Sequence, residues 1–340
     1  MRALHHTLEQ LLQRRDLSEA EAGALLRELT EPNLAPPLAG ALLAALRAKG
    51  VTADEVRGFA DAMRSLARKP ALPPTPDAID IVGTGGDASG SLNLSTGAAL
   101  LTAACGMPVI KHGNRSVTSR SGSADVIEAA GLRLPLDEAR AAACFEAVGF
   151  TFLFAPYFHP AMKALAPVRS ALGVRTVFNL LGPLTNPAAP RFLLVGAFNA
   201  ETAELMAGTL AGMSVERAWV VHGAAGWDEA TPIGPCLTFE VEGASVRRRE
   251  VDPEEFGLSR CQPSELAGGD AAHNFQAILE VFDRKDRGAH LAALLLQAGM
   301  ALVVGGRASS IAGGIARARD AVASGEARAW LHRLQRFAQS

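Results

Sequence analysis

The sequence predicts an α/β fold, built from a small all-helical domain and a large α/β domain with a mainly parallel central sheet flanked by helices. Three observations predict it. Residues 1–68 show only helical patterns, a proline-rich connector spans residues 69–77, and strand-like segments alternate with helix-like ones from Ile79 onward. Proline cannot continue a helix, and strand–helix alternation is typical of parallel sheets, so we place the domain boundary at the connector. The predicted domains span residues 1–70 and 78–340.

The N-terminal segment carries several helix signals. Leucines recur at helical spacing from the start of the chain: Leu4, Leu8, Leu11 and Leu12. Ser18 and Thr52 are each followed three residues later by a glutamate, which is the pattern of a capping box at a helix start. We therefore predict helices that begin near Glu19 and Ala53, with another helix after the Pro36–Pro37 break.

From Ile79 onward, short segments suited to strands alternate with alanine-rich segments. The predicted strands are residues 79–82, 108–110, 150–154, 192–197 and 218–221. The predicted helices between them include residues 96–105, 123–130, 137–147 and 201–212. Residues 236–250 contain two β-rich runs joined by a Glu242–Gly243 turn, which predicts a hairpin. Helical patterns return from Asn274, so the order of elements favours a sheet covered by helices.

The composition is that of a globular protein. Of 340 residues, 49% are hydrophobic and 20% are charged, and the net charge is −2. This balance argues against disorder, and the lack of a basic excess argues against a nonspecific nucleic-acid binder. The four cysteines form no C-x-x-C pair, no signal-peptide pattern opens the chain, and the apolar runs are too short to span a membrane. We expect a soluble cytoplasmic protein with no nucleic-acid or membrane partner.

The first candidate loop follows the strand predicted at residues 79–82. It reads Gly83-Thr-Gly-Gly-Asp87, and its glycines let backbone N–H groups converge on phosphate oxygens, although a glycine cluster alone equally fits a tight turn. Residues 93–96 then open a helix, whose N-terminus attracts anions. Ser95 or Thr96 also suits the N-cap of this helix, and we expect one of them to occupy it.

The second candidate loop is expected to start directly after residues 108–110. Cationic, amide and hydroxyl side chains crowd it: Lys111, Asn114, Arg115, Ser116, Ser119 and Ser121. Alone, these residues fit a solvated polar loop. Because open α/β sheets bind ligands at the carboxyl ends of their strands, the two loops together favour a phosphate-binding site.

Two further segments suit such a site. Asp228 and Glu229 follow the strand predicted at residues 218–221. Adjacent carboxylates there suit Mg²⁺ when a phosphate shares the ion, although alone they fit an acidic turn. Arg169 lies ten residues after His159 and suits a carboxylate ligand. Alone, His159 fits a helix cap and Arg169 fits a solvent-facing side chain.

These motifs, in this order and spacing, resemble the anthranilate phosphoribosyltransferases, a family of the nucleoside-phosphorylase-like class. The resemblance covers essentially the whole chain, and its most specific pieces are Gly83–Asp87, Asn93–Thr96, Lys111–Arg115, Phe178–Pro187 and His222–Glu229. It implies transfer of the phosphoribosyl group of 5-phosphoribosyl 1-pyrophosphate (PRPP) to the amine of anthranilate in tryptophan biosynthesis, with Mg²⁺ as cofactor. It also implies a homodimer formed through the helical domain, on which part of residues 165–185 would pack.

The resemblance implies roles for individual residues. Those that would bind PRPP are Gly83, Gly86, Asp87, Ser91, Asn93, Leu94, Ser95, Thr96, Lys111, His112, Gly113, Asn114, Arg115, Ser116, Val117, Thr118, Ser119 and Ser123. The magnesium ligands would be Ser95, Asp228 and Glu229. Anthranilate would contact Gly83, Asn114 and Arg169, and its channel would be lined by His112, His159 and Pro183. Electrostatic and positional catalysis, without a covalent intermediate, would rest on Lys111, Arg169, Asp228 and Glu229.

The chain departs from the family pattern at His273, where an acid usually precedes the asparagine, and within Thr231–Cys236. Neither place carries an assigned residue. Two alternatives remain: a pyrimidine nucleoside phosphorylase-like enzyme, which shares the glycine motif, and a non-catalytic nucleic-acid-binding paralogue. Arg169 with Asn114 favours a carboxylate-bearing acceptor, and the net charge and the intact acidic pair argue against the paralogue.

Overall fold

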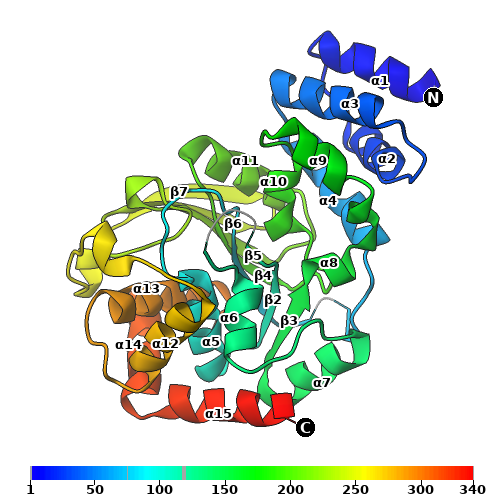
Figure 1. Cartoon of the computed structure of the whole chain (residues 1–340). Helices are drawn as coiled ribbons and strands as arrows, with labels where there is room; N and C mark the ends of the chain where they lie inside the picture. The colour runs from blue at the N-terminus through cyan, green and yellow to red at the C-terminus, as the bar shows by residue number, and fades with distance from the viewer. Residues whose placement is uncertain (1, 75, 117–119, 340) are drawn as a thin grey trace.

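The structure is a computed structural model that describes residues 2–74, 76–116 and 120–339. The N-terminal helices form one end of the molecule, and the larger α/β part carries the sheet (Figure 1). These helices are α1 (Arg2–Leu12), α2 (Glu19–Leu29), α3 (Pro36–Lys49) and α4 (Ala53–Leu66). Two later helices, α9 (Ala166–Leu172) and α10 (Phe178–Leu181), pack beside them, with α9 against α3 and α10 against α4.

The larger part is built on a seven-stranded sheet in the order β3-β2-β1-β4-β5-β6-β7. Its strands are β1 (Ile79–Gly83), β2 (Val109–Gly113), β3 (Phe150–Phe154), β4 (Phe192–Gly196), β5 (Arg217–His222), β6 (Cys236–Glu242) and β7 (Ser245–Val251). Strands β1 to β5 pair in parallel, whereas β6 and β7 add an antiparallel hairpin at one side. The predicted fold class is therefore confirmed, and so are the strands and the hairpin.

Helices cover both faces of the sheet. The α-helices of this part are α5 (Leu94–Ala104), α6 (Ser123–Ala129), α7 (Glu138–Val148), α8 (Ala155–Phe158), α11 (Ala200–Ala211), α12 (Ala271–Phe282), α13 (Ala289–Val304), α14 (Ile311–Ala323) and α15 (Glu326–Gln339). Short 3₁₀ helices are η1 (Pro160–Lys163), η2 (Gly182–Leu184), η3 (Ala224–Gly226), η4 (Pro253–Phe256) and η5 (Pro263–Leu266). None of the helices in the described ranges combines the length and apolar character needed to cross a membrane.

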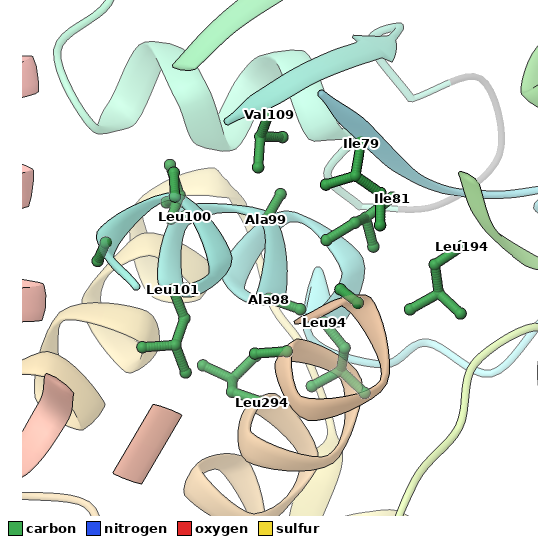
Figure 2. Packing of buried hydrophobic residues seen from close by; sticks show 14 of the residues in the cluster. Ile79, Ile81, Leu94, Ala98, Ala99, Leu100, Leu101, Val109, Leu194 and Leu294 are labelled. Carbon is green, nitrogen blue, oxygen red and sulfur yellow. The ribbon is translucent and has the colours of Figure 1, made fainter. Parts of the chain in front are cut away.

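Alternate side chains of the central strands enter two different apolar clusters, as the period of a strand requires. Leu194 and Val221 pack in the cluster that contains α5 and α13. Figure 2 shows side chains of α5 against Ile79 and Ile81 of β1. Leu193 points the other way, into a cluster that joins α11 to the N-terminal helices. The apolar interior therefore runs from the N-terminal helices onto one sheet face, and the division into domains at the connector stays a prediction.

The helix signals of the N-terminal segment are confirmed. Ser18 and Thr52 each accept a hydrogen bond from the backbone N–H three residues on and receive the glutamate side chain in return, so α2 and α4 begin with capping boxes. Glu55 also accepts from Leu17 N–H at 2.9 Å, which ties the start of α2 to α4. Leu12 differs from Leu4 and Leu11, which are buried, because it is 61% exposed.

Candidate functional site

The parallel strands end at one edge of the sheet, and the loops that leave this edge carry most of the predicted residues. Strands β1, β2 and β4 end at glycines, and β5 ends at His222. The register places Gly83 beside Gly196. Carboxyl ends of neighbouring parallel strands converge there, which is where open α/β sheets bind ligands.

The glycine loop after β1 wraps around the side chain of Asp228. Gly85 N–H donates to Asp228 Oδ2 at 2.6 Å, and Asp228 N–H donates to Asp87 Oδ2 at 3.3 Å. A side chain at Gly83 would clash with the Asp228 carboxylate. Gly85 and Gly86 have φ angles of 68° and 76°, in the left-handed region that favours glycine. The glycines of the motif therefore let the backbone approach an acid closely.

Asp228 and Glu229 are acids whose negative charge this environment opposes. Glu229 Oε1 accepts from Ser95 N–H at 2.9 Å, whereas Oε2 is buried without a hydrogen-bond partner in the described part of the chain. Burial, with a smaller contribution from the charge of Asp87, raises the pKa of Asp228 to about 7. Burial, with a smaller contribution from the charge of Asp228, raises the pKa of Glu229 well above its usual value. A bound cation would relieve both effects.

This donor set fits a magnesium ion that is shared with a phosphate. The residues described by the structure contain no group of three or more His, Cys, Asp or Glu side chains around one metal position. Mg²⁺ commonly uses only one or two protein carboxylates and completes its shell with water and substrate phosphates. The unpartnered Glu229 Oε2 and the neighbouring Asp228 supply such a pair.

The N-cap of α5 is Asn93, so the expectation that Ser95 or Thr96 caps this helix is wrong. The Asn93 side chain makes no capping bond. Its Nδ2 group donates to Ser121 O at 3.1 Å, and its Oδ1 accepts from Asn274 Nδ2 at 2.7 Å. Asn93 thus ties the first loop to the second. Thr96 Oγ1 is buried without a partner among the described residues.

The other predicted residues of this stretch differ from one another. Leu94 is fully buried and packs in the core beside α13 (Figure 2), so only its backbone is available to a ligand. Ser91 Oγ lies 3.0 Å from Ser89 Oγ, which donates to Asp87 Oδ1 at 3.0 Å. These hydroxyl groups orient Asp87 toward the acidic pair.

Lys111 lies inside β2 and not at the start of a loop, which corrects the predicted loop boundary. Its side chain is only 1% exposed, and its Nζ donates to the carbonyl of Ile81. Burial lowers the pKa of Lys111, and the charge of Asp80 opposes this. Asp80 is itself buried and accepts from Asn186 Nδ2 at 2.9 Å. Lys111 therefore supports the strands behind the site, where it places a positive charge close to Glu229.

The rest of the second loop is described in part. Three of its predicted residues, Val117, Thr118 and Ser119, lie outside the described residues. Arg115 forms ion pairs with Glu128 and Asp125, with Nη2 at 2.8 Å from Glu128 Oε1 and Nη1 at 3.2 Å from Asp125 Oδ1. Ser116 N–H donates to Asp125 Oδ2 at 3.2 Å. Arg115 is thus engaged with acids of α6 in this structure.

Gly113, Asn114 and Ser123 meet where β2 ends. Ser123 Oγ donates to Asn114 O at 3.3 Å, and Asn114 Oδ1 accepts from Arg115 N–H at 2.7 Å. A side chain at Gly113 would clash with Ser123 and with the ring of Phe152. The absence of a side chain at position 113 therefore allows α6 to start next to the strand.

A cavity of about 310 Å³ lies beside this loop. Four of the predicted acceptor-site residues line it: His112, Asn114, His159 and Arg169. Apolar walls are supplied by Met63, Met162, Phe178 and Leu181. Pro183 is not among the lining residues, whereas its neighbours Gly182 and Thr185 are. The volume of the cavity, and its apolar walls with few polar groups, are those of a small-molecule site.

Arg169 is a cation in this cavity for which the described residues supply no acidic partner. Its guanidinium carbon lies 5.2 Å from the centroid of the Phe178 ring. Burial alone lowers the pKa of Arg169, with no acid acting against it. An arginine remains charged at neutral pH. The N–H donors along the edge of its planar guanidinium are therefore available to a carboxylate.

Two buried histidines form the polar end of the cavity wall. The rings of His112 and His159 make an edge contact, with centroids 5.1 Å apart. Burial lowers the pKa of His112 to about 3 and that of His159 to about 4, the Thr185 backbone opposing the latter shift. Both rings are therefore neutral at pH 7. His159 makes no side-chain capping bond to η1, so a helix cap does not explain it.

The tautomer of His112 follows from its partner. Its Nδ1 lies 3.1 Å from the carbonyl oxygen of Gly182, which can only accept a hydrogen bond. Nδ1 therefore carries the proton, and the buried Nε2 keeps a lone pair that has no partner in the described ranges. Neither ring nitrogen of His159 makes a well-formed hydrogen bond to a described residue. The cavity wall thus presents unused hydrogen-bonding groups.

Sequence reasoning missed several residues of the site. Met63 reaches the cavity from α4, more than 40 positions before the second loop, and no local pattern marks it. Arg175 donates from Nη2 to the carbonyl of Gly86 and stacks 4.1 Å from the centroid of the Phe198 ring. Asp80 is an acid within an apolar strand, and this local conflict was a signal that could have identified it.

Comparisons with known proteins agree with this geometry. Two family models match the chain: the glycosyl transferase family helical bundle domain over residues 5–67, and the glycosyl transferase family a/b domain over residues 75–328. The anthranilate phosphoribosyltransferase of Methylobacterium radiotolerans is 48% identical, over 94% of this chain and 92% of the relative. That of Rubrobacter xylanophilus is 46% identical, over 95% and 94% of the two chains.

Solved structures give the same result. The crystal structure of anthranilate phosphoribosyltransferase from Thermus thermophilus superposes with a TM-score of 0.90 and 40% identity, covering 98% of this chain and 99% of the other. The enzyme from Saccharomyces cerevisiae in complex with PRPP and Mg superposes with a TM-score of 0.88 and 26% identity, covering 99% and 98% of the two chains.

Proposed function

The chain belongs to the anthranilate phosphoribosyltransferase family, and from this premise we propose how its residues transfer the phosphoribosyl group of PRPP to anthranilate, a step of tryptophan biosynthesis. The reaction joins the amine nitrogen of anthranilate to C1 of the ribosyl phosphate and releases pyrophosphate. The observation that carries the proposal is the placement of Arg169. This cation, which has no acidic partner among the described residues, lines a cavity of about 310 Å³ next to the loops that suit a phosphorylated sugar.

The glycine loop and the start of α5 are proposed to hold PRPP. The loop of residues 83–87 and residues 93–96, with Ser91 and Ser123, would contact its phosphates and ribose, while the N–H groups of Gly85 and Ser95 stay bonded to Asp228 and Glu229. Asp228 and Glu229, with Ser95, would hold Mg²⁺ together with the pyrophosphate of the substrate. The raised pKa values of the two acids support this role, because a nearby cation favours their charged forms.

The cavity lined by Arg169 and His112 is proposed to hold anthranilate. Arg169 would clamp its carboxylate with two parallel hydrogen bonds, and Phe178 and Met63 would cover its ring. The unpartnered Nε2 of His112 is a neutral acceptor in the same cavity wall. It would accept a hydrogen bond from the amine and so point the nitrogen lone pair toward the ribose. Asn114 lies at the same wall and would contact the ring or its amine.

Catalysis would then be positional and electrostatic. The amine of anthranilate is uncharged at neutral pH and needs little help from a base. The difficult event is the departure of pyrophosphate, while positive charge develops on the ribose. Bound Mg²⁺ supplies positive charge to the leaving group. Lys111 adds a fixed positive charge behind the acidic pair and keeps β1 and β2 in register, so its catalytic role would be to position the neighbouring groups.

We also propose that the protein is a cytoplasmic homodimer that associates through its helical domain, residues 1–70 with part of 165–185. Two exposed apolar side chains support this surface: Leu12 on α1, 61% exposed, and Val174 after α9, 57% exposed. Helix α3 contacts both α1 and α9, so the helix that carries Leu12 and the helix that precedes Val174 pack against the same neighbour.

One assay tests the proposed function. The protein is incubated with PRPP, Mg²⁺ and anthranilate, and the loss of anthranilate fluorescence is followed. We expect turnover that requires all three components, and no turnover with aniline, which lacks the carboxylate. Absence of anthranilate turnover together with phosphorolysis of thymidine or uridine would show a nucleoside phosphorylase-like enzyme. Tight, salt-sensitive oligonucleotide binding instead would indicate the nucleic-acid-binding alternative.

A further inference from the structure

A small cavity of about 10 Å³ is lined by both members of the acidic pair. Most of its wall is apolar and comes from β1, β4 and β5, including Ile81 and Leu194. Its polar lining consists of Ser95, Asp228, Glu229 and Gln297. A space of this size accommodates one water molecule, provided that two to four polar groups surround it.

Gln297 is the one member of this lining that the proposed chemistry does not use. It lies in α13, which is otherwise mostly apolar, and it is 3% exposed. Its Nε2 group is buried and makes no hydrogen bond with any residue that the structure describes. Burying an amide donor without a partner is unfavourable, so a donor in this position calls for an acceptor.

Glu229 carries an acceptor that lacks a donor among the described residues. Its Oε1 is fixed by Ser95 N–H at 2.9 Å, while its Oε2 is buried without a partner among the described residues. Gln297 and Glu229, the two residues that carry these groups, line the same cavity. One water molecule satisfies both groups, because it accepts a hydrogen bond from the amide and donates one to the carboxylate.

We propose that Gln297 is a positioning residue for the acidic pair and that it acts through one buried water. The water takes one lone pair of Glu229 Oε2 and leaves the other to the cation, while Ser95 N–H holds Oε1, so the carboxylate plane is fixed relative to Asp228. This inference rests on the proposed function in one respect: the fixed plane matters because the pair receives the cation that accompanies PRPP. Partners of this kind behind a metal ligand tune the affinity for the metal.

The direct test is a high-resolution crystal structure of the metal-free wild-type protein. We expect one ordered water within hydrogen-bonding distance of both Gln297 Nε2 and Glu229 Oε2. An empty cavity, or a Gln297 side chain that bonds elsewhere, would overturn the proposal. This outcome does not depend on catalysis, so it stands apart from the success or failure of the proposed function.

The second test separates positioning from a merely structural role. In Gln297→Leu we expect the Mg²⁺ concentration at half-maximal rate to rise about tenfold, with the KM for anthranilate within about twofold of wild type. Gln297→Asn keeps an amide and should shift the Mg²⁺ requirement less, and it also serves if the leucine variant does not fold. The matched control is Thr102→Val, which removes another buried and unpartnered group in α5, outside the cavity.

Each result of the second test has one meaning. A normal Mg²⁺ requirement in Gln297→Leu, with or without a loss of thermal stability, would leave Gln297 as a packing residue and refute the proposal. Equal shifts in Gln297→Leu and Thr102→Val would do the same. If wild-type protein shows no transfer to anthranilate, the proposed function fails. The crystal structure alone then decides whether Gln297 holds Glu229 through a water.

Discussion

The two halves of the site differ in how their polar groups are satisfied. On the phosphate side, the charged side chains each make a contact: Asp228 accepts from Gly85 N–H, Glu229 Oε1 from Ser95 N–H, and Arg115 pairs with Glu128. In the cavity lined by Arg169 and the two histidines (the acceptor cavity), the residues that the structure describes provide no acidic partner for Arg169 and no hydrogen-bond partner for three ring nitrogens. One half is held together internally, and the other is open.

This difference indicates how each substrate would be received. The acceptor cavity is preformed, so an aromatic carboxylate can enter without displacing protein contacts. The phosphate side has acids whose charges are opposed by burial, and under the proposed function a cation and a phosphate would complete it together. If the two halves are separable in this way, a substitution in one half should leave the binding of the other substrate unchanged.

The acidic pair gives the largest effect. In the double variant Asp228→Asn with Glu229→Gln, we expect kcat/KM to fall by at least about 10³-fold, since the cation that stabilises the leaving pyrophosphate loses its protein ligands. The amide oxygens still accept from Gly85 and Ser95, so the fold should remain. Thermal stability should rise, because burial raises the pKa of both acids and so disfavours their charges.

The measurement combines steady-state rates at increasing Mg²⁺ with a thermal melt of the ligand-free protein. Glu204→Gln, an exposed position on α11, is the control for a lost negative charge. An active double variant with an unchanged Mg²⁺ requirement would contradict the assignment of the metal site.

Arg169 gives the next largest effect, and on the other half of the site. In Arg169→Ala we expect kcat/KM for anthranilate to fall about 10²-fold, the loss of a charge-assisted pair of hydrogen bonds, with the KM for PRPP within about twofold of wild type. Arg140→Ala is a matched control, because Arg140 also stacks on a phenylalanine, 4.2 Å from the centroid of Phe337, but far from the cavity. An equal loss for both substrates would mean that the two halves are not separable.

The sequence and the structure agree best where local rules decide the outcome. The strands, the hairpin and the capping boxes at Ser18 and Thr52 depend on neighbouring residues and were predictable. The residues alone also predict that the two loops bind phosphate, which stays a prediction, whereas the choice of anthranilate came from the resemblance. The acceptor cavity was harder, because Met63 comes from α4 and Phe178 from α10. Contacts between segments so far apart leave no local pattern.

Two failures have a physical reason in common. Lys111 was expected in a polar loop, yet β2 continues to Gly113 and buries the lysine, where Asp80 and the Ile81 carbonyl compensate its charge. Ser95 and Thr96 were expected as caps, yet Asn93 occupies the N-cap and bonds across to another loop. In both cases a tertiary partner outweighs the local preference of a polar residue.

The two histidines predict how the preformed cavity responds to acid. Their pKa values, about 3 for His112 and about 4 for His159, lie below the ordinary value of 6.5. Below pH 6.5 the unfolded chain therefore takes up protons that the folded protein refuses, and stability falls as pH falls. From pH 7.5 to pH 5.0 we expect each histidine to cost about 2 kcal/mol of unfolding free energy.

The measurement is urea unfolding of wild type and of His112→Asn at both pH values. Asparagine can still donate to the Gly182 carbonyl, so the variant should lose about 2 kcal/mol less on acidification than wild type. His332→Asn, at an exposed position on α15, should behave as wild type. An unchanged loss in His112→Asn would mean that the His112 ring is protonated in the folded protein.

The smallest effect concerns the ion pair of Arg115 on the phosphate side. Arg115 is 48% exposed and is held by Glu128 on α6, whereas the resemblance places it on the phosphates of PRPP. Exposed ion pairs of this kind are worth roughly 0.2–1 kcal/mol, so freeing Arg115 in Glu128→Gln should lower the KM for PRPP only about two- to threefold, with the KM for anthranilate unchanged. Glu326→Gln, which breaks the similarly exposed pair with Arg333, is the matched control.

A higher KM for PRPP in Glu128→Gln would show that the pair with Glu128 builds the phosphate side instead of competing with it. In that case both halves of the site would be preformed, and the contrast between them would disappear at this position.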